Sequence, residues 1–349
     1  MSKARNLADV ISGQYDIPAE SLDNAPPSQG KNLIINGAMQ VAQRGTSSTT
    51  NGYATVDRFA GSYSGPTKTQ SQEALSSGDP FDEGFRNFFR MTNTDIVTNT
   101  ATHYATIYHG FEAQDIASCG WNYTSESSYI TLSFWVRSSV AQTFYGYLRA
   151  FDGTASLYTF GFDVSADTWT KVTKTIAGDS NLQFDNNADL GLQLQISAFW
   201  GTNFTSSGAT LNSWNAFNGG SRFPDFDDTW ATTDEATFDI TGVQLEVGSV
   251  ATPFEHRSYG EELAACQRYT RLVRMDDYGV VGPNGYWLQS QPVSPEMRAS
   301  PSITTLSSNI GAGTLFIEAT SNWLRYGASG ATAGNGINGF AFWRLEAEL

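Results

Sequence analysis

Ser128–Arg137 reads SYITLSFWVR and alternates large apolar side chains with others that are mostly polar. One face of the segment carries Ile130, Leu132, Phe134 and Val136, and the other carries Thr131, Ser133, Trp135 and Arg137. Successive side chains of a strand point to opposite faces, so a period of two predicts a β-strand with one face on a core. The segment therefore predicts a strand of a packed sheet.

Runs of similar composition recur along the chain and are separated by polar, glycine-bearing segments. They lie at residues 53–60, 86–92, 103–112, 143–151, 156–163, 169–176, 190–197 and 236–247. No helical pattern intervenes between them. Short strands that follow one another in this way predict an all-β fold, an antiparallel β-sandwich of the jelly-roll kind over residues 31–257.

Residues 1–30 have a different pattern. Leu7, Val10 and Ile11 fall at i, i+3 and i+4 and form one apolar stripe on a short helix. Residues 23–30, DNAPPSQG, are typical of an extended linker. Because a helix this short is only marginally stable in water, we expect its apolar stripe to contact a partner surface. The alternative is a frayed terminus.

Residues 258–349 are predicted to begin with a helix and to continue as a small β-domain. Ser258 and Glu261 have the spacing of a capping box at the start of this helix. The expected helix face consists of Tyr259, Leu263, Cys266 and Thr270. Strands are expected at 277–281, 286–291, 301–306, 314–320 and 339–346, with a hairpin turn at 282–285 between the first two. A unit this small can bury only a thin hydrophobic core by itself, so we expect it to oligomerise.

The composition argues against several classes of partner. The 349 residues include 35 acidic and 20 basic side chains, which gives a net charge of −15. Nucleic acids and anionic membrane surfaces should repel such a chain. There is no run of about 18 apolar residues, so no membrane insertion is expected, and the first residues lack the apolar core of a secretory signal. Cys119 and Cys266 are expected to be small hydrophobic side chains rather than a disulfide.

Residues that could carry catalysis are present but are not arranged in a recognisable pattern. The histidines, expected to be exposed and free of metal, are His103, His109 and His256. The carboxylates considered for glycoside cleavage are Glu112, Asp115, Asp152 and Asp163. Nothing in the sequence pairs two of them for that reaction. Residues 334–339 fit G-x-G-x-x-G but open onto a strand, which argues against a dinucleotide site. We therefore expect no enzymatic activity and no required cofactor.

Residues 201–235 are predicted to form a long irregular loop, in which glycine, serine, asparagine and aspartate are mixed with aromatic residues. Trp200, Trp214 and Trp230 are candidates for carbohydrate contact, because sugar C–H faces stack on indole rings. The alternative is that these rings pack the loop onto the sandwich or onto a neighbouring subunit.

A calcium ion is a further candidate ligand of the same loop. Asp225, Asp227 and Asp228 bring three carboxylates together in sequence, and calcium prefers oxygen ligands. Their spacing does not match a known calcium loop. The alternative is a solvated acidic loop.

Several motifs occur in order along almost the whole chain. They are Asn32–Gly45 (NLIINGAMQVAQRG), Tyr53–Phe59 (YATVDRF), Ile130–Arg137, Thr241–Gly248 (TGVQLEVG), Ala251–Glu255 (ATPFE), Glu262–Tyr269 (ELAACQRY), Met297–Pro301 and Glu346–Leu349. Together they resemble a family of bacteriophage tail-fibre and appendage proteins found in phages of aquatic bacteria. From the residues alone, Asp57 and Arg58 are interpreted as an exposed pair that orients the chain, and the TGVQLE and CQRY segments as packing elements.

The resemblance implies a jelly-roll similar to carbohydrate-binding modules, a homotrimeric fibre and recognition of a host surface. Residues 1–30 would bind other phage tail proteins, 31–257 would form the sandwich, and 258–349 would form the distal or trimerising unit. The receptor would be a bacterial surface glycan or protein, and the protein would act outside the cell as part of the virion. The alternatives are a polysaccharide depolymerase on the same sandwich and a purely structural collar or head fibre.

Overall fold

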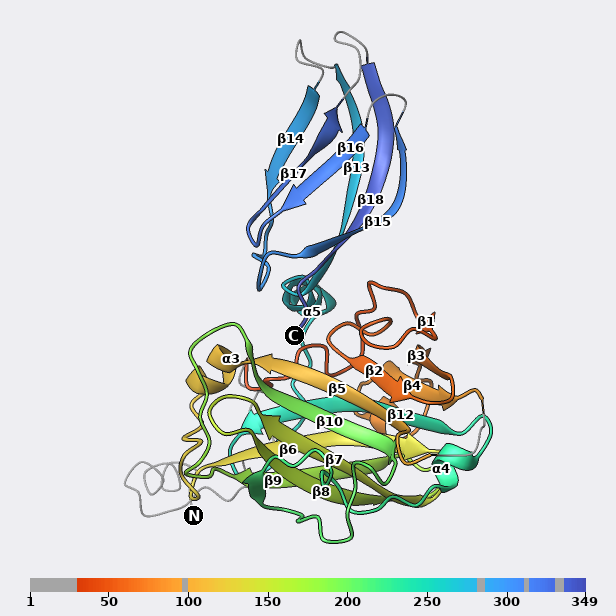
Figure 1. Cartoon of the computed structure of the whole chain (residues 1–349), viewed down its shortest axis with the longest axis vertical. Helices are drawn as coiled ribbons and strands as arrows, with labels where there is room; N and C mark the ends of the chain where they lie inside the picture. The colour runs from red at the N-terminus through yellow and green to blue at the C-terminus, as the bar shows by residue number, and fades with distance from the viewer. Residues whose placement is uncertain (1–29, 96–99, 281–285, 311–313, 330–335) are drawn as a thin grey trace, which may run out of the picture.

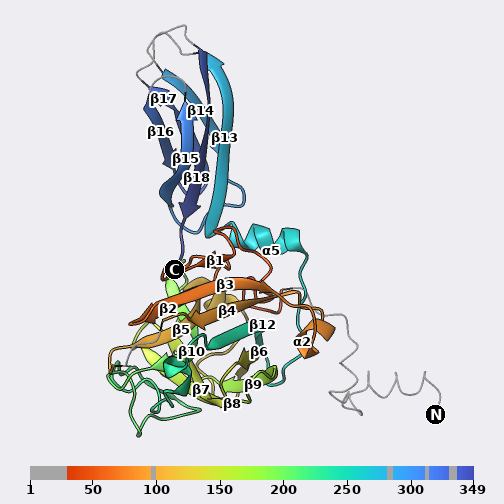
Figure 2. The ribbon, with the colours of Figure 1, turned by 90° about the vertical axis from the view of Figure 1, so that its right-hand side faces the viewer.

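The computed structural model describes residues 30–95, 100–280, 286–310, 314–329 and 336–349 (Figure 1). Strands dominate these residues, so the prediction of an all-β fold is confirmed. A large sandwich and a smaller elongated unit are joined by one helix and by the last residues of the chain (Figure 2). The predicted anchoring residues Leu7, Val10 and Ile11 lie outside the described residues. Within the described ranges, no helix is long and apolar enough to cross a membrane.

The sandwich consists of two six-stranded sheets whose neighbouring strands run antiparallel. The first sheet contains, in spatial order, β1 (Ser47–Ser48), β3 (Lys68–Ala74), β4 (Asn87–Asn93), β12 (Thr237–Val247), β6 (Tyr129–Ser138) and β9 (Thr170–Ala177). The second contains β11 (Trp214–Ala216), β8 (Ser156–Val164), β7 (Gln142–Ala150), β10 (Leu190–Trp200), β5 (Tyr104–Glu112) and β2 (Ala60–Ser64). Short helices at the periphery are α2 (Asp79–Asp82), α3 (Ala113–Ser118) and α4 (Thr229–Thr232).

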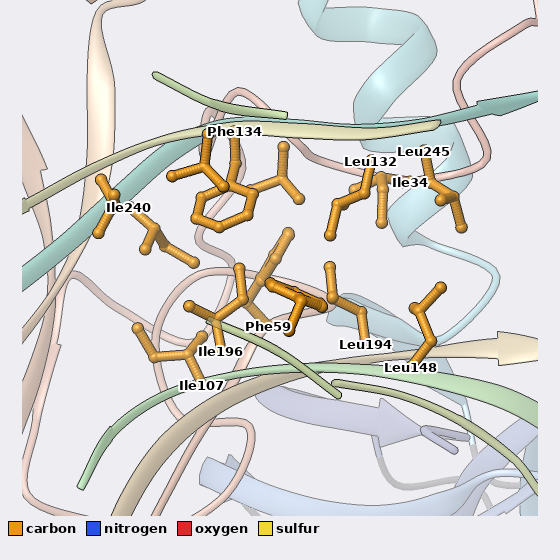
Figure 3. Close-up of a cluster of buried hydrophobic side chains, with 14 of the residues drawn as sticks. Ile34, Phe59, Ile107, Leu132, Phe134, Leu148, Leu194, Ile196, Ile240 and Leu245 are labelled. Atoms are coloured by element: carbon orange, nitrogen blue, oxygen red, sulfur yellow. The ribbon is translucent and has the colours of Figure 1, made fainter. Parts of the chain in front are cut away.

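The core lies between the two sheets, where the predicted apolar face of β6 is buried. Figure 3 shows side chains of the first sheet, which include Leu132, Phe134, Ile240 and Leu245, above Ile107, Leu148, Leu194 and Ile196 of the second. Leu132 and Phe134 are 0% exposed. At roughly 25 cal/mol for each Å² of apolar surface removed from water, this layer supplies the main stabilisation of the sandwich.

The opposite face of β6 is also largely covered, which the alternating pattern did not predict. Trp135 is only 7% exposed and packs with Leu75, Phe85 and Phe88. Phe81 of α2 and Phe254 of the ATPFE segment pack against the same cluster. Segments distant in sequence therefore add a partial third layer over this sheet.

Two departures from the predicted strands of the sandwich have a local reason. Residues 53–60 were expected to be a strand, but the chain turns there and Arg58 has a left-handed φ of 68°, which is incompatible with a regular strand. β3 was not predicted, because its sequence KTQSQEA is almost entirely polar. Cys119 and Cys266 are free thiols, as expected, and Cys266 is fully buried.

The unit that follows begins with α5 (Tyr259–Cys266), whose capping box is confirmed by both of its hydrogen bonds. The predicted apolar face is confirmed at Cys266, which is buried, and is wrong at Tyr259, which is 56% exposed. Glu262, which was not predicted to lie on this face, is buried. Two three-stranded sheets complete the unit. They are β13 (Thr270–Val280), β18 (Gly336–Glu346) and β15 (Ser302–Ile310), and β14 (Tyr286–Pro292), β17 (Trp323–Ser329) and β16 (Thr314–Ala319).

The expected hairpin between residues 277–281 and 286–291 is wrong. β13 pairs with β18 and β14 pairs with β17, so the two strands belong to different sheets. β17 was not predicted. The small core between these sheets is centred on Trp343, which is 0% exposed, with Leu324, Tyr326 and Leu345 around it.

Buried ion pairs join the sandwich to the smaller unit. Arg44 donates from Nε to Glu346 at 2.8 Å and from Nη2 to Glu348 at 2.9 Å. Arg58 also pairs with Glu348. The interpretation of Asp57 and Arg58 as an exposed pair is wrong, because both are 0% exposed. Burial raises the pKa of Asp57 to about 6, although hydrogen bonds from Gln43 oppose this shift.

The CQRY segment forms a second part of this joint. Arg268 donates to Glu112 of β5 from Nε at 2.9 Å and from Nη2 at 2.7 Å, and the Tyr269 hydroxyl donates to the same carboxylate at 2.7 Å. Burial by itself would raise the pKa of Glu112, but these hydrogen bonds outweigh it and hold the pKa below its ordinary value. The segment therefore fixes the end of α5 to the sandwich.

Replacing Tyr269 by phenylalanine tests this joint. The substitution removes one hydrogen bond to a buried carboxylate, so the free energy of unfolding should fall by about 2 kcal/mol in urea denaturation. Tyr259→Phe is the matched control, because Tyr259 is 56% exposed and makes no side-chain hydrogen bond within the described residues. Equal stabilities for the two variants would contradict a role for Tyr269 in the joint.

Candidate functional site

The loop at residues 201–235, which we call the aromatic loop, packs against the outer face of the second sheet. Phe223 is 0% exposed and stacks on Tyr147 of β7 with a centroid distance of 5.3 Å. Trp200, at the end of β10, stacks on Tyr104 of β5 at 4.5 Å with an interplanar angle of 14°. These contacts fix the loop on the sheet. Most of its aromatic side chains therefore pack against the sandwich, which was the alternative to carbohydrate contact.

Two of the three predicted carbohydrate-contact tryptophans are enclosed by protein. Trp200 is 4% exposed, lies between Tyr104 and the Arg222 guanidinium, and donates from Nε1 to the Ser197 hydroxyl. Trp230 is 0% exposed and donates from Nε1 to the carbonyl of Thr237 at 3.0 Å. Neither ring offers a free face for a sugar, so the prediction of carbohydrate contact is wrong for both.

Trp214 is the remaining candidate, and its ring is half-buried. β11 pairs with β8 and places Trp214 beside Tyr158, with ring centroids 5.5 Å apart. The indole Nε1–H donates to the carbonyl of Ala177 in β9 at 2.9 Å, which links the edges of the two sheets. The ring is thus held in one orientation before any ligand arrives.

Trp214 lines a hollow of about 310 Å³ at this edge of the sandwich, which we call the Trp214 hollow. Its other lining residues are Thr154, Ser156, Asp179, Asn181, Asn215 and Ala216. This volume lies at the lower end of the range of small-molecule sites. One aromatic ring beside several polar groups offers stacking and hydrogen bonds to a polar ligand.

The polar side chains of the Trp214 hollow are partly preorganised. Asp179 accepts hydrogen bonds at Oδ1 from the backbone and side-chain amides of Asn181, both at 2.8 Å. Asn215 donates from Nδ2 to the carbonyl of Ser213 at 3.0 Å. Among the described residues, the side-chain oxygens of Asn181 and Asn215 and the second oxygen of Asp179 have no hydrogen-bond partner. They are available to accept hydrogen bonds from hydroxyl groups of a ligand.

The three aspartates predicted as calcium ligands lie near Trp200 and not in the Trp214 hollow. They line a separate hollow of about 480 Å³ together with the edge of Trp200. Asp225 accepts from the Thr205 hydroxyl at 2.6 Å, and Asp227 accepts from the backbone amide of Thr229 at 2.8 Å. Within the described part of the chain, no group of three or more histidine, cysteine, aspartate or glutamate residues could hold a metal ion. The structure therefore does not support a calcium site at Asp225, Asp227 and Asp228.

The other candidate residues are dispersed over the fold. His109 was expected to be exposed, but it is 1% exposed and lies between the rings of Phe59 and Phe111. His256 is exposed, and its Nε2 lies 2.9 Å from the carbonyl oxygen of Glu83. Glu112 belongs to the joint described above. The contacts of His256 with Glu83 and of Glu112 with Arg268 could not be predicted from the sequence, because the partners are 173 and 156 positions apart.

No protein-family model matches the chain, and neither does any curated protein sequence. Among solved structures, it is similar to the enzymatically active domain of tailspike protein 4 of bacteriophage CBA120, with 11% identity, a TM-score of 0.35, and coverage of 63% of this chain and 22% of the tailspike. A family 11 carbohydrate-binding module of Clostridium thermocellum has 11% identity, a TM-score of 0.27 and coverage of 60% and 98%. A cyclase from Fischerella sp. TAU has 9% identity, a TM-score of 0.35 and coverage of 63% and 99%. Similarities this distant assign neither a ligand nor an activity.

Alanine substitution should separate the structural tryptophans from exposed ones. Trp230→Ala leaves a large cavity in the core, so the free energy of unfolding should fall by roughly 3–5 kcal/mol in chemical denaturation. Trp323→Ala is the control, because Trp323 is 37% exposed and its loss should change stability far less. If Trp230→Ala were as stable as the control, the buried placement of this ring would be contradicted.

Proposed function

We propose that this chain is a non-enzymatic, glycan-binding subunit of a phage tail fibre that attaches the virion to a bacterial surface. The observation that carries the glycan-binding part is the Trp214 hollow, where a fixed, half-buried indole lies beside Asp179, Asn181 and Asn215. Sugars offer C–H faces to aromatic rings and hydroxyl groups to amides and carboxylates. The hollow provides both kinds of contact.

The lining of the hollow favours binding over cleavage. Glycoside hydrolysis uses two carboxyl groups that flank the scissile bond. Among the described residues that line the hollow, Asp179 supplies the one carboxylate, and its Oδ1 already accepts two hydrogen bonds from Asn181. This arrangement supports a receptor-binding role in preference to the depolymerase alternative.

The tail-fibre part of the proposal rests on the order of the sequence motifs. Residues 1–30, with the stripe of Leu7, Val10 and Ile11, would bind other tail proteins. The sandwich would present the Trp214 hollow to the host. Three subunits would strengthen an attachment that one weak site alone could not maintain. Once one subunit is bound, the linked subunits meet the same surface at a high effective concentration.

Binding of the purified protein to an array of bacterial envelope and capsular glycans tests the glycan-binding proposal. Trp214→Ala should weaken binding about tenfold, equivalent to about 1.4 kcal/mol, through loss of the stacking ring. Asn181→Ala should weaken it about three- to tenfold while leaving the fold intact, because this side chain is exposed. Trp323→Ala, which removes an exposed tryptophan of the smaller unit, should bind like the original chain.

The same assay separates the alternatives. Shortened chains or new reducing ends after incubation would establish a depolymerase and overturn the non-enzymatic proposal. Absence of binding to any glycan on the array would instead favour a structural collar or head fibre.

Light scattering of the full chain tests the proposed trimer. Three copies of a 38.0 kDa chain have a mass of about 114 kDa. This mass is expected across a tenfold range of protein concentration, because a fibre subunit should not dissociate readily. A species of 38.0 kDa at all concentrations would contradict the trimer.

A further inference from the structure

Two arginines on the outer face of the second sheet have no acidic partner among the described residues. Arg149 of β7 and Arg222 of the aromatic loop form no ion pair with any residue in the described ranges. The chain carries 35 acidic and only 20 basic side chains, so an unpaired guanidinium is not explained by a shortage of acids. Both side chains are half-buried and therefore remain accessible to a ligand.

Aromatic rings hold both guanidinium groups. The Cζ of Arg149 lies 3.6 Å from the ring centroid of Phe217 and 4.3 Å from that of Phe151. Arg222 lies over Trp200 at 4.9 Å and donates from Nε to the carbonyl of Gly219 at 3.1 Å. The rings supply cation–π attraction but accept no ordinary hydrogen bonds, so most N–H donors of the two groups are unused.

One further polar atom on this face, in Gln195, has no hydrogen-bond partner among the described residues. Gln195 of β10 is 5% exposed, and its Oε1 and the Nε of Arg149 are buried without a hydrogen-bond partner in the described part of the chain. Tyr147 pairs in register with Gln195. Burial raises the pKa of Tyr147 to about 12, while the nearby Arg222 and Arg149 oppose this shift. The two guanidinium groups lie close together, because Arg149 is 3.6 Å and Arg222 is 5.4 Å from the ring centroid of Phe217.

This cluster lies beside the Trp214 hollow. Asn215 of the hollow pairs with Leu157 of β8, and Leu157 pairs with Arg149 of β7. Cross-strand partners lie on the same face of a sheet, so Asn215 and Arg149 share the outer face. Two strand spacings separate their backbones by about 10 Å. Trp214, the neighbour of Asn215 in β11, pairs with Tyr158 and points to the other face, so an oligosaccharide that contacts both places has to cross this edge strand.

We propose that Arg149 and Arg222 bind an oxyanion, a carboxylate or a phosphate, on an acidic glycan whose neighbouring sugar occupies the Trp214 hollow. The inference rests on the proposed glycan-binding function and adds the chemical class of the ligand. Guanidinium groups form strong, charge-assisted hydrogen bonds to such oxyanions. The two cations would also offset the repulsion between an anionic ligand and a chain of net charge −15.

The test compares acidic and neutral forms of one glycan. An acidic glycan that binds on the bacterial array is tested again after its carboxyl groups are reduced and, separately, after its phosphate groups are removed. The two treatments distinguish a carboxylate from a phosphate ligand. One of these treatments should weaken binding about tenfold, as should Arg149→Gln and Arg222→Gln, because each loses a charge-assisted hydrogen bond. Arg325→Gln is the control, since Arg325 is a surface arginine of the smaller unit that pairs with Glu318. Binding of the original chain should also weaken with added salt, and the two variants should show a smaller salt dependence.

The outcomes separate this inference from the function on which it rests. Glycan binding that depends on Trp214 but is unchanged by both treatments and by both glutamine variants would overturn the oxyanion site and leave the glycan-binding proposal intact. Failure of the original chain to bind any acidic or neutral glycan on the array would overturn both. Thermal denaturation of Arg149→Gln and Arg222→Gln should show only a small fall in melting temperature, because each substitution removes cation–π contacts but breaks no ion pair with a described residue.

Discussion

A charge that leaves water must gain a partner, and this constraint determines how the parts of the protein meet. Asp239 of β12 is 0% exposed, and the guanidinium groups of Arg90 and Arg137 bind it from the neighbouring strands β4 and β6. Glu112 is equally buried and is bound by Arg268 from beyond α5. In each case the partner comes from another segment, so pairing the charge also fixes the position of that segment.

The same constraint explains why the motifs that occur in order along the chain need not mark a ligand site. Arg44, Arg58, Arg268 and Glu348 all belong to such motifs, and all of them lie in the joint between the sandwich and the smaller unit. Removing one member of a buried pair leaves the other charge without compensation, typically at a cost of about 3–5 kcal/mol. Substitution at these positions is therefore expected to be strongly restricted by stability alone.

The sequence alone predicted the fold class, but it did not predict which side chains contact one another across the fold. Alternation in SYITLSFWVR predicted which face of β6 packs on the core, because this pattern depends only on the local geometry of a strand. The burial of Asp57 and His109 could not be predicted, because it depends on segments that fold over them from elsewhere. Glu112 and Arg268 are 156 positions apart, and no local pattern relates them. The three tryptophans were alike in sequence, and only their surroundings distinguish Trp214 from the enclosed rings of Trp200 and Trp230.

Pairing also provides a criterion for separating structural arginines from those available for recognition. A structural arginine such as Arg58 is buried and its charge is matched by a carboxylate, so a ligand can neither reach it nor gain from it. Arg149 and Arg222 have the opposite properties, since rings orient them, no acid of the described residues neutralises them, and both keep a solvent-accessible surface. An acid placed beside them would stabilise the free protein but would also compete with an anionic ligand. Their lack of a partner is therefore an expected property of a recognition site in an otherwise acidic chain.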